Sequence, residues 1–413
     1  MDISNAPVRA PRGSQRPLLI LAGLVAGLVC GTLAAGTDAA RPLLAASRPI
    51  GRLWLDGLTM TVVPLVFALL VGGMAGAARS AATGVARRAV AWFATLLVAA
   101  SFASAALTPL ALAAWQQPPG AETLALAAPA APPAAAAAPW YENILPANPV
   151  RAAADGAMVP IVVFALLLGL ALARVEALPR SALLAAISAL GQAMLVIVDW
   201  ILWLAPVGVF ALAIGVGLAA GAGIAGVLAH YVVIVIAACL MATLIAIVCA
   251  IVAGRISPLA FLRAALPAQI VAGATQSSLA ALPAMIATSA PLGVDRATAG
   301  IVLPLSVSLF RMASAAANVT VAIYVAGLHG VALPVTALLA GAAVAATVSI
   351  AAVGLPAQVS FIAVIAPVCL AMGVPITLLP LLMAIETIPD MFRTIGNVTG
   401  GLAVTRITGR SSP

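Results

Sequence analysis

The sequence predicts an all-α polytopic membrane protein, and three observations carry this prediction. The chain has 413 residues, of which 64% are hydrophobic and 7% are charged, whereas soluble domains contain about 25% charged residues. Its apolar runs are long enough for helical spans, since a helix needs about 20 apolar residues to cross a bilayer. In lipid, only helices and closed barrels satisfy the backbone. A soluble enzyme is therefore excluded.

The first 254 residues contain a series of apolar runs. A basic tail, residues 1–16, precedes a run at 17–36 that lacks a small-residue cleavage site, so we interpret this run as a first helix and not as a signal peptide. A Pro/Ala-rich stretch at 116–147 is typical of an exposed extracellular loop. The other apolar runs lie at 53–77, 89–115, 156–175, 181–218 and 226–254.

Beyond residue 258 the apolar segments are interrupted by polar residues, prolines and glycines. The interruptions lie at 274–283, 308–318 and 351–360. Irregular backbone at membrane depth is tolerated where protein buries it or water reaches it, and it is typical of a transporter's binding site. We therefore expect two re-entrant helical hairpins, at 258–291 and 335–370. Ordinary proline-kinked helices are the alternative.

The arginines predict the orientation of the chain. All nineteen basic residues are Arg, which excludes a lysine P-loop and a Schiff-base lysine. With the N-terminus in the cytoplasm, thirteen arginines lie inside, four outside and two in the membrane, which agrees with the positive-inside rule. Arg41, Arg48 and Arg52 are outside and run against the rule. We expect a multi-pass protein of the cytoplasmic (inner) membrane, with the lipid bilayer and no nucleic acid as partner.

Four ionisable residues lie in apolar segments of the last third: Arg311, Glu386, Asp390 and Arg393. Charges inside a membrane are costly, so each is a functional hypothesis by default. Glu386, Asp390, Arg393 and Asn397 are spaced by four, three and four residues, which places them along one face of a helix. Two interpretations remain at this point, a structural ion pair between Asp390 and Arg393 or the wall of a ligand cavity.

The residue types in this cluster indicate which ligand such a cavity would bind. Arg393 offers a planar fork for a carboxylate, and Asp390 beside it suits an ammonium group. Asn397 can both donate and accept a hydrogen bond. Ser277 and Ser278, in the first interrupted segment, offer hydroxyls and free N–H groups for a second carboxylate. A solute with two carboxylates and one amine fits these groups, which describes an acidic amino acid.

Several motifs resemble, in the same order, those of the dicarboxylate/amino acid:cation symporters, the glutamate transporter homologues. DMFRTIGNVTG at 390–400 resembles the last-helix motif D-x-x-R-T-x-x-N-V-T-G, and ATQSSLAALP resembles the serine-rich first hairpin. VGLPAQ, with Gly354 and Pro356, is similar to the tip of the second hairpin. Further similarities lie in the second, fourth and fifth helices, at 59–74, 148–172 and 205–212.

The resemblance implies eight transmembrane helices and two re-entrant hairpins in a homotrimeric, elevator-type transporter. Its scaffold would comprise residues 17–88 and 148–218, and its transport domain 89–115 and 219–410, with a broken seventh helix. By position, Asp390 would bind the substrate amine, Arg393 the side-chain carboxylate and Ser278 the main carboxylate. Thr394 and Asn397 would complete the pocket. Having both Asp390 and Arg393 favours aspartate or glutamate.

The chain departs from this family where the family binds sodium. The seventh-helix motif N-M-D-G-T is replaced by Phe310, Arg311, Met312, Ala313 and Ser314, and Gly401 stands where the family has an Asp. Sodium requires oxygen ligands. We therefore predict no metal site and no cofactor, and a transport mechanism in which the Arg311 guanidinium replaces sodium. The alternative for Arg311 is a side chain that snorkels from a helix edge.

If coupling persists, a proton on Glu386 or Asp390 is the expected carrier. The alternative substrates are C4-dicarboxylates or other amino acids, carried by a proton-coupled symporter or exchanger. An anion channel and an uncoupled sensor are the rival functions. No enzyme motif such as H-E-x-x-H or G-x-S-x-G is present.

Overall fold

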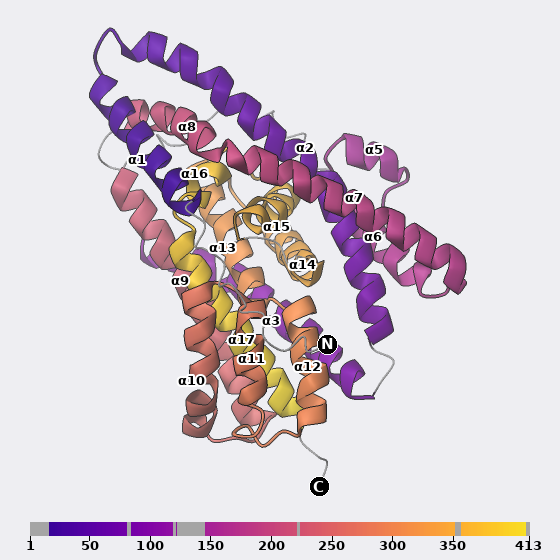
Figure 1. Cartoon of the computed structure of the whole chain (residues 1–413). Coiled ribbons are helices and arrows are strands. Elements are labelled where there is room, and N and C mark those ends of the chain that lie inside the picture. Colours follow the sequence, from indigo (N-terminus) through magenta and orange to yellow (C-terminus); the bar gives the residue numbers. More distant parts are fainter. Residues whose placement is uncertain are drawn as a thin grey trace, which may run out of the picture.

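The computed structural model describes residues 16–80, 84–118, 121, 145–220, 224–351 and 357–409. Every secondary-structure element in these ranges is a helix (Figure 1). Five helical segments in the described part are long and apolar enough to cross a membrane, and several shorter apolar helices accompany them. The prediction of an all-helical membrane protein is thereby confirmed. The number of eight spans stays a prediction.

We describe the helices in two groups, those up to residue 220 and those from residue 224 onwards. Those of the first half are α1 (Arg16–Ala34), α2 (Ala40–Ser80), α3 (Gly84–Ala114), α5 (Pro149–Ala154), α6 (Met158–Leu172), α7 (Ala177–Trp203) and α8 (Ala205–Ala220). Those of the second half are α9 (Ile224–Val252), α10 (Pro258–Thr275), α11 (Ser278–Ala287), α12 (Arg296–Leu309), α13 (Met312–Leu328), α14 (Val335–Ala351), α15 (Ala357–Ala371), α16 (Leu379–Met383) and α17 (Thr387–Thr408).

Two boundaries in the first half differ from the predicted ones. Helix α2 begins at Ala40 and not near residue 53, so Arg41, Arg48 and Arg52 belong to a helix. Its first turns carry three arginines among alanines, leucines and prolines, and Arg52 pairs with Asp56 one turn later, at 3.9 Å. The run at 181–218 divides into α7 and α8, because the chain turns at Leu204. The segment at 148–172 divides at Gly156, whose φ is +67°, where the predicted apolar run at 156–175 begins.

Helices α1 and α8 pack together through glycine. Gly23, Gly27 and Gly31 follow each other at intervals of one turn, and an added Cβ at each would collide with main-chain atoms of α8. At Gly27 the obstacles are the carbonyl oxygen of Phe210 and the Cβ of Ala213. Close backbone approach through small residues is a common way for membrane helices to associate, because lipid provides no hydrophobic force between them.

The second half contains the predicted interruptions. Helix α10 ends at Gln276 in a left-handed conformation (φ 52°), and Ser277 caps α11 with its side chain. Helices α10 and α11 pack against each other as a hairpin. Helices α12 and α13 are separated by Phe310 and Arg311, which have extended and irregular backbone. Residues 352–356 of the second predicted hairpin, including Gly354 and Pro356, lie outside the described residues.

The last turn of α17 closes one end of this half, where α10, α11, α12 and α17 meet (Figure 1). Arg406 donates hydrogen bonds from Nε to the carbonyl oxygen of Gly254 (2.9 Å) and from Nη1 to that of Leu292 (3.0 Å). Gly254 follows α9, and Leu292 precedes α12. One guanidinium therefore joins the loops on both sides of the α10–α11 hairpin.

Candidate substrate site

The break between α12 and α13 is held by an amide from α17. Asn397 Oδ1 accepts hydrogen bonds from the main-chain N–H groups of Ala313 (2.9 Å) and Ser314 (3.3 Å). Its Nδ2 donates to Ser314 Oγ (3.0 Å). The first N–H groups of a helix have no partner within the helix, so a side chain from elsewhere can supply one. Asn397 thus fixes α17 to the broken helix.

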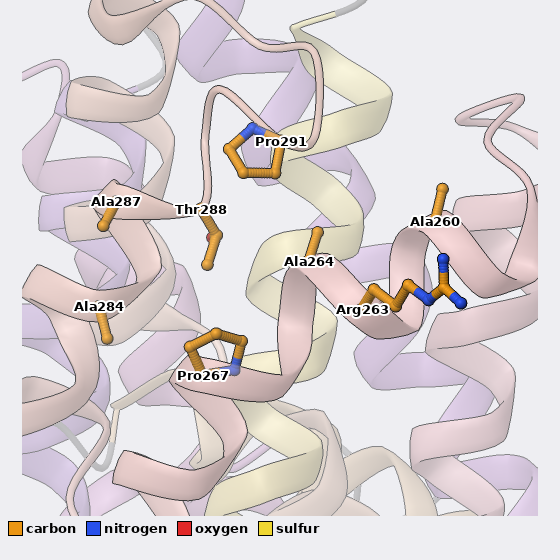
Figure 2. Close-up of a pocket in the computed structure, with 8 residues that line it drawn as sticks. All are labelled: Ala260, Arg263, Ala264, Pro267, Ala284, Ala287, Thr288 and Pro291. Carbon is orange, nitrogen blue, oxygen red and sulfur yellow. The ribbon is translucent and has the colours of Figure 1, made fainter.

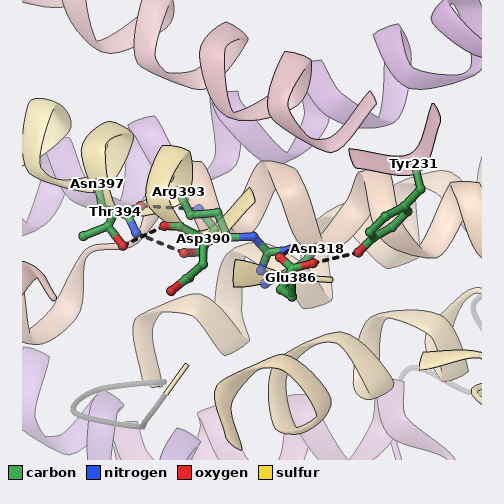
Figure 3. Close-up of polar contacts among 8 residues, drawn as sticks. Tyr231, Asn318, Glu386, Asp390, Arg393, Thr394 and Asn397 are labelled. Carbon is green, nitrogen blue, oxygen red and sulfur yellow. Dashed lines mark hydrogen bonds and ion pairs between the residues drawn. The ribbon is translucent and has the colours of Figure 1, made fainter. Parts of the chain in front are cut away.

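Arg393 lies one turn before Asn397 and is buried with Glu386. Its Nη2 lies 2.6 Å from Glu386 Oε1, and its Nη1 donates to Asn318 Oδ1 at 3.2 Å. Tyr231 OH, from α9, donates to the other oxygen of Glu386 at 2.8 Å. Figure 3 shows this chain of polar contacts. The structural ion pair considered for Asp390 and Arg393 is therefore wrong as to its partner, because Arg393 pairs with Glu386.

One nitrogen of the Arg393 guanidinium has no acceptor. Nε is buried and makes no hydrogen bond to any residue that the structure describes. Nη2 is engaged by Glu386 in the ion pair, although its alignment is not that of a hydrogen bond. Asn318 Nδ2 is also buried without an acceptor among these residues. Buried donors without acceptors are destabilising by about 1–3 kcal/mol each. Nε therefore offers a contact to a ligand carboxylate, beside the Nη2 that Glu386 already occupies.

Asp390 and Arg311 form a second, looser pair of charges. Both side chains are half-buried, and their charges interact, yet no ion pair within 4.0 Å joins them among the described residues. The Asp390 carboxylate also has no hydrogen-bonded partner there. The Thr394 hydroxyl donates to the main-chain oxygen of Asp390 (2.8 Å), so it is already engaged. A free carboxylate thus lies on the helix that also presents the Arg393 guanidinium.

The serines of the first hairpin have different local roles. The Ser277 hydroxyl accepts a hydrogen bond from the N–H of Ala280 (3.2 Å) and is used as a helix cap. Ser278 is half-buried at the first position of α11, and α11 contacts α17.

Sequence reasoning missed Tyr231 and Asn318 as site residues. Their only signal is that each is a polar residue in an apolar or small-residue helical segment.

The positions where related transporters are expected to hold sodium are packed mainly with apolar side chains, beside one hydroxyl. A Cβ added to Gly401 would meet Ser306 Oγ at 2.7 Å and Met285 Cε at 3.1 Å. At Gly400 it would meet Met312 Sδ and Phe310 Cε1, both at 2.7 Å. Phe310 also stacks on Phe93, with 4.7 Å between ring centroids. Among the residues searched, no three His, Cys, Asp or Glu side chains group as metal ligands do.

Apolar spans around a charged site at a broken helix define a helical membrane protein built like a secondary transporter. Residues 17–411 match the model of the sodium:dicarboxylate symporter family, so the chain belongs to this family. The resemblance seen in the sequence is thereby confirmed, and the protein belongs to a family of transporters and not of enzymes. A comparison with curated proteins found no relative that matches.

Proposed function

We propose that the protein transports an acidic amino acid, aspartate or glutamate, across the cytoplasmic membrane. The observation that carries this proposal is the buried Nε of Arg393, which has no acceptor among the described residues. A carboxylate bound there would supply this acceptor. It would share the guanidinium with Glu386, which faces Nη2, and with Asn318, which accepts from Nη1.

The other groups of the site favour an amino acid over a plain diacid. The Asp390 carboxylate suits the substrate ammonium, because it has no partner of its own among the described residues. Thr394 and Asn397 are occupied by internal hydrogen bonds, so we assign them to the wall of the pocket. Ser277, Ser278, Gly354 and Pro356 would enclose the substrate from the two hairpins, with Ser278 at its main carboxylate.

We further propose that transport does not require sodium. Phe310, Met312 and Met285 fill most of the space around Gly400 and Gly401, and apolar atoms are poor sodium ligands. The one hydroxyl there, that of Ser306, donates to the carbonyl oxygen of Leu303. Arg311 provides a fixed positive charge that interacts with Asp390, as a bound cation would. The two acids Glu386 and Asp390 then balance the two arginines. A proton on one of these acids is the remaining carrier for coupled transport.

Uptake of labelled aspartate into proteoliposomes containing the purified protein tests both proposals. We expect saturable uptake that is the same in sodium and choline media and that increases with an inward proton gradient. Strict sodium dependence would refute the role of Arg311 while leaving the substrate assignment intact. Absence of saturable aspartate and glutamate uptake under every gradient would refute the assignment itself. The homotrimer, the elevator movement and the cytoplasmic N-terminus belong to the same proposal.

A C4-dicarboxylate is the second candidate, because the family is named for dicarboxylates. The two candidates differ in their use of Asp390, which a diacid without an amine does not need. We expect Asp390→Asn to weaken aspartate uptake more than succinate uptake. Preference of the unmodified protein for succinate would favour the second candidate.

A further inference from the structure

A groove opens between α10 and α11 at the base of their hairpin, on the side away from the tip at Gln276. Its volume is about 400 Å³, within the range of ligand sites. Small or cyclic side chains form most of its wall, as Figure 2 shows. The lining residues are Ala260, Arg263, Ala264, Pro267, Ala284, Ala287, Thr288 and Pro291.

The groove is almost entirely apolar. Four alanines and two prolines leave space between the helices, because none of them reaches across it. The one hydroxyl, that of Thr288, donates to the carbonyl oxygen of Met285 at 2.6 Å and is not free for a ligand. The body of an occupant must therefore be apolar, and only Arg263 can contact a polar group on it.

Arg263 lies within an exposed apolar stripe of α10. Leu259, Leu262 and Leu266, which surround it at intervals of one to four residues, are 57%, 41% and 53% exposed. Arg263 itself is exposed and has no ion pair or hydrogen bond among the described residues. A lone charge among side chains suited to lipid calls for a partner. A long Arg stem can follow the apolar surface while its head reaches the headgroup layer.

We propose that this groove binds an anionic phospholipid, with an acyl chain between α10 and α11 and the headgroup phosphate on Arg263. A guanidinium binds phosphate through two parallel hydrogen bonds. Exposed Arg255, in the loop joined to α17 by Arg406, adds positive potential at the same end of the hairpin. The inference is independent of the transported substrate.

The test uses the full-length protein in nanodiscs of phosphatidylcholine with a minor fraction of phosphatidylglycerol. Mass spectrometry of the intact protein after release counts the retained lipids. Arg263→Gln removes the charge, and Ala284→Leu fills the groove while keeping Arg263. Arg296→Gln is the matched control, since Arg296 is an exposed arginine close to this end that does not line the groove. Unchanged thermal melts verify folding of each variant.

We expect the unmodified protein and Arg296→Gln to retain phosphatidylglycerol well above its bulk fraction. Arg263→Gln should retain both lipids without preference, and Ala284→Leu should retain at least threefold less phosphatidylglycerol. Equal retention by Arg263→Gln and the unmodified protein would overturn the headgroup assignment. Displacement of the lipid by glycerol phosphate alone, or normal retention by Ala284→Leu, would overturn the placement of the acyl chain.

Discussion

Two helix contacts in this protein differ in their use of buried polar side chains. Helices α1 and α8 approach through three glycines of α1, against main-chain atoms of α8. Helices α13 and α17 are joined by side-chain hydrogen bonds, from Asn397 to the start of α13 and from Arg393 to Asn318. Helices α13 and α17 are also close to each other at Gly396, whose added Cβ would meet Ala313 Cβ at 2.6 Å. The second contact is therefore distinguished by its buried polar side chains and not by looser packing.

The largest expected effect is on the polar contact. Arg393→Ala removes the proposed carboxylate contact and leaves Glu386 buried without its ion-pair partner. Losing one member of a buried charge pair costs about 2–5 kcal/mol, so the uptake efficiency for aspartate should fall at least about 30-fold. Uptake kinetics in proteoliposomes measure this loss. Arg151→Ala, on the exposed face of α5, is the control, and normal aspartate uptake by Arg393→Ala would place the site elsewhere.

The glycine contact should respond to a single methyl group. Gly27→Ala places a Cβ against Phe210 and Ala213, and overpacking of this kind costs about 1–3 kcal/mol. Gly72→Ala is the matched control, because Gly72 is an exposed helical glycine whose added Cβ meets nothing within 4 Å. We expect the Tm to fall for Gly27→Ala and to stay or rise for Gly72→Ala. Equal Tm values would show that the α1–α8 approach is not limiting.

Two variants of Asn397 separate the structural and ligand roles of the polar contact. Asn397→Leu leaves the N–H groups of Ala313 and Ser314 buried without their acceptor, at about 1–3 kcal/mol. Asn397→Asp keeps the acceptor at a helix N-terminus, where negative charge is favourable. Thermal melts should therefore show a lower Tm for Asn397→Leu alone. Aspartate affinity should fall in Asn397→Asp as well, because the added charge repels an anion, and unchanged affinity would contradict this placement.

The smallest effect is expected at Asp295, an exposed residue whose side chain caps the start of α12. The Asp295 carboxylate accepts a hydrogen bond from the N–H of Thr298 (2.8 Å), which lowers its pKa below the ordinary value of 3.8. This stabilisation is complete above the unfolded pKa and is lost as the pH falls through the folded one. Asp295→Ala should lower the Tm slightly at pH 7, and this loss should shrink as the pH falls through the folded pKa. Asp295→Asn, which keeps a cap, should show no such pH dependence.

Much of the fold could be predicted because long apolar runs and their interruptions are local signals. The breaks at residues 276–277 and 310–311 fall within the predicted interruptions. The start of α2 was not predicted, because arginines and prolines at 41–52 interrupt the apolar pattern, yet these residues are helical. The charged residues of α17 were found from their spacing. Their partners were not, since the pairing of Glu386 with Arg393 and Tyr231 depends on how distant helices pack.

The position of Arg406 has a consequence for biosynthesis. The loops that it joins, after α9 and before α12, are synthesised more than a hundred residues before it. During translation the base of the α10–α11 hairpin therefore lacks these hydrogen bonds until Arg406 has been synthesised. A chain truncated before Arg406 would still contain α9 to α16 but would lack the guanidinium that joins these two loops.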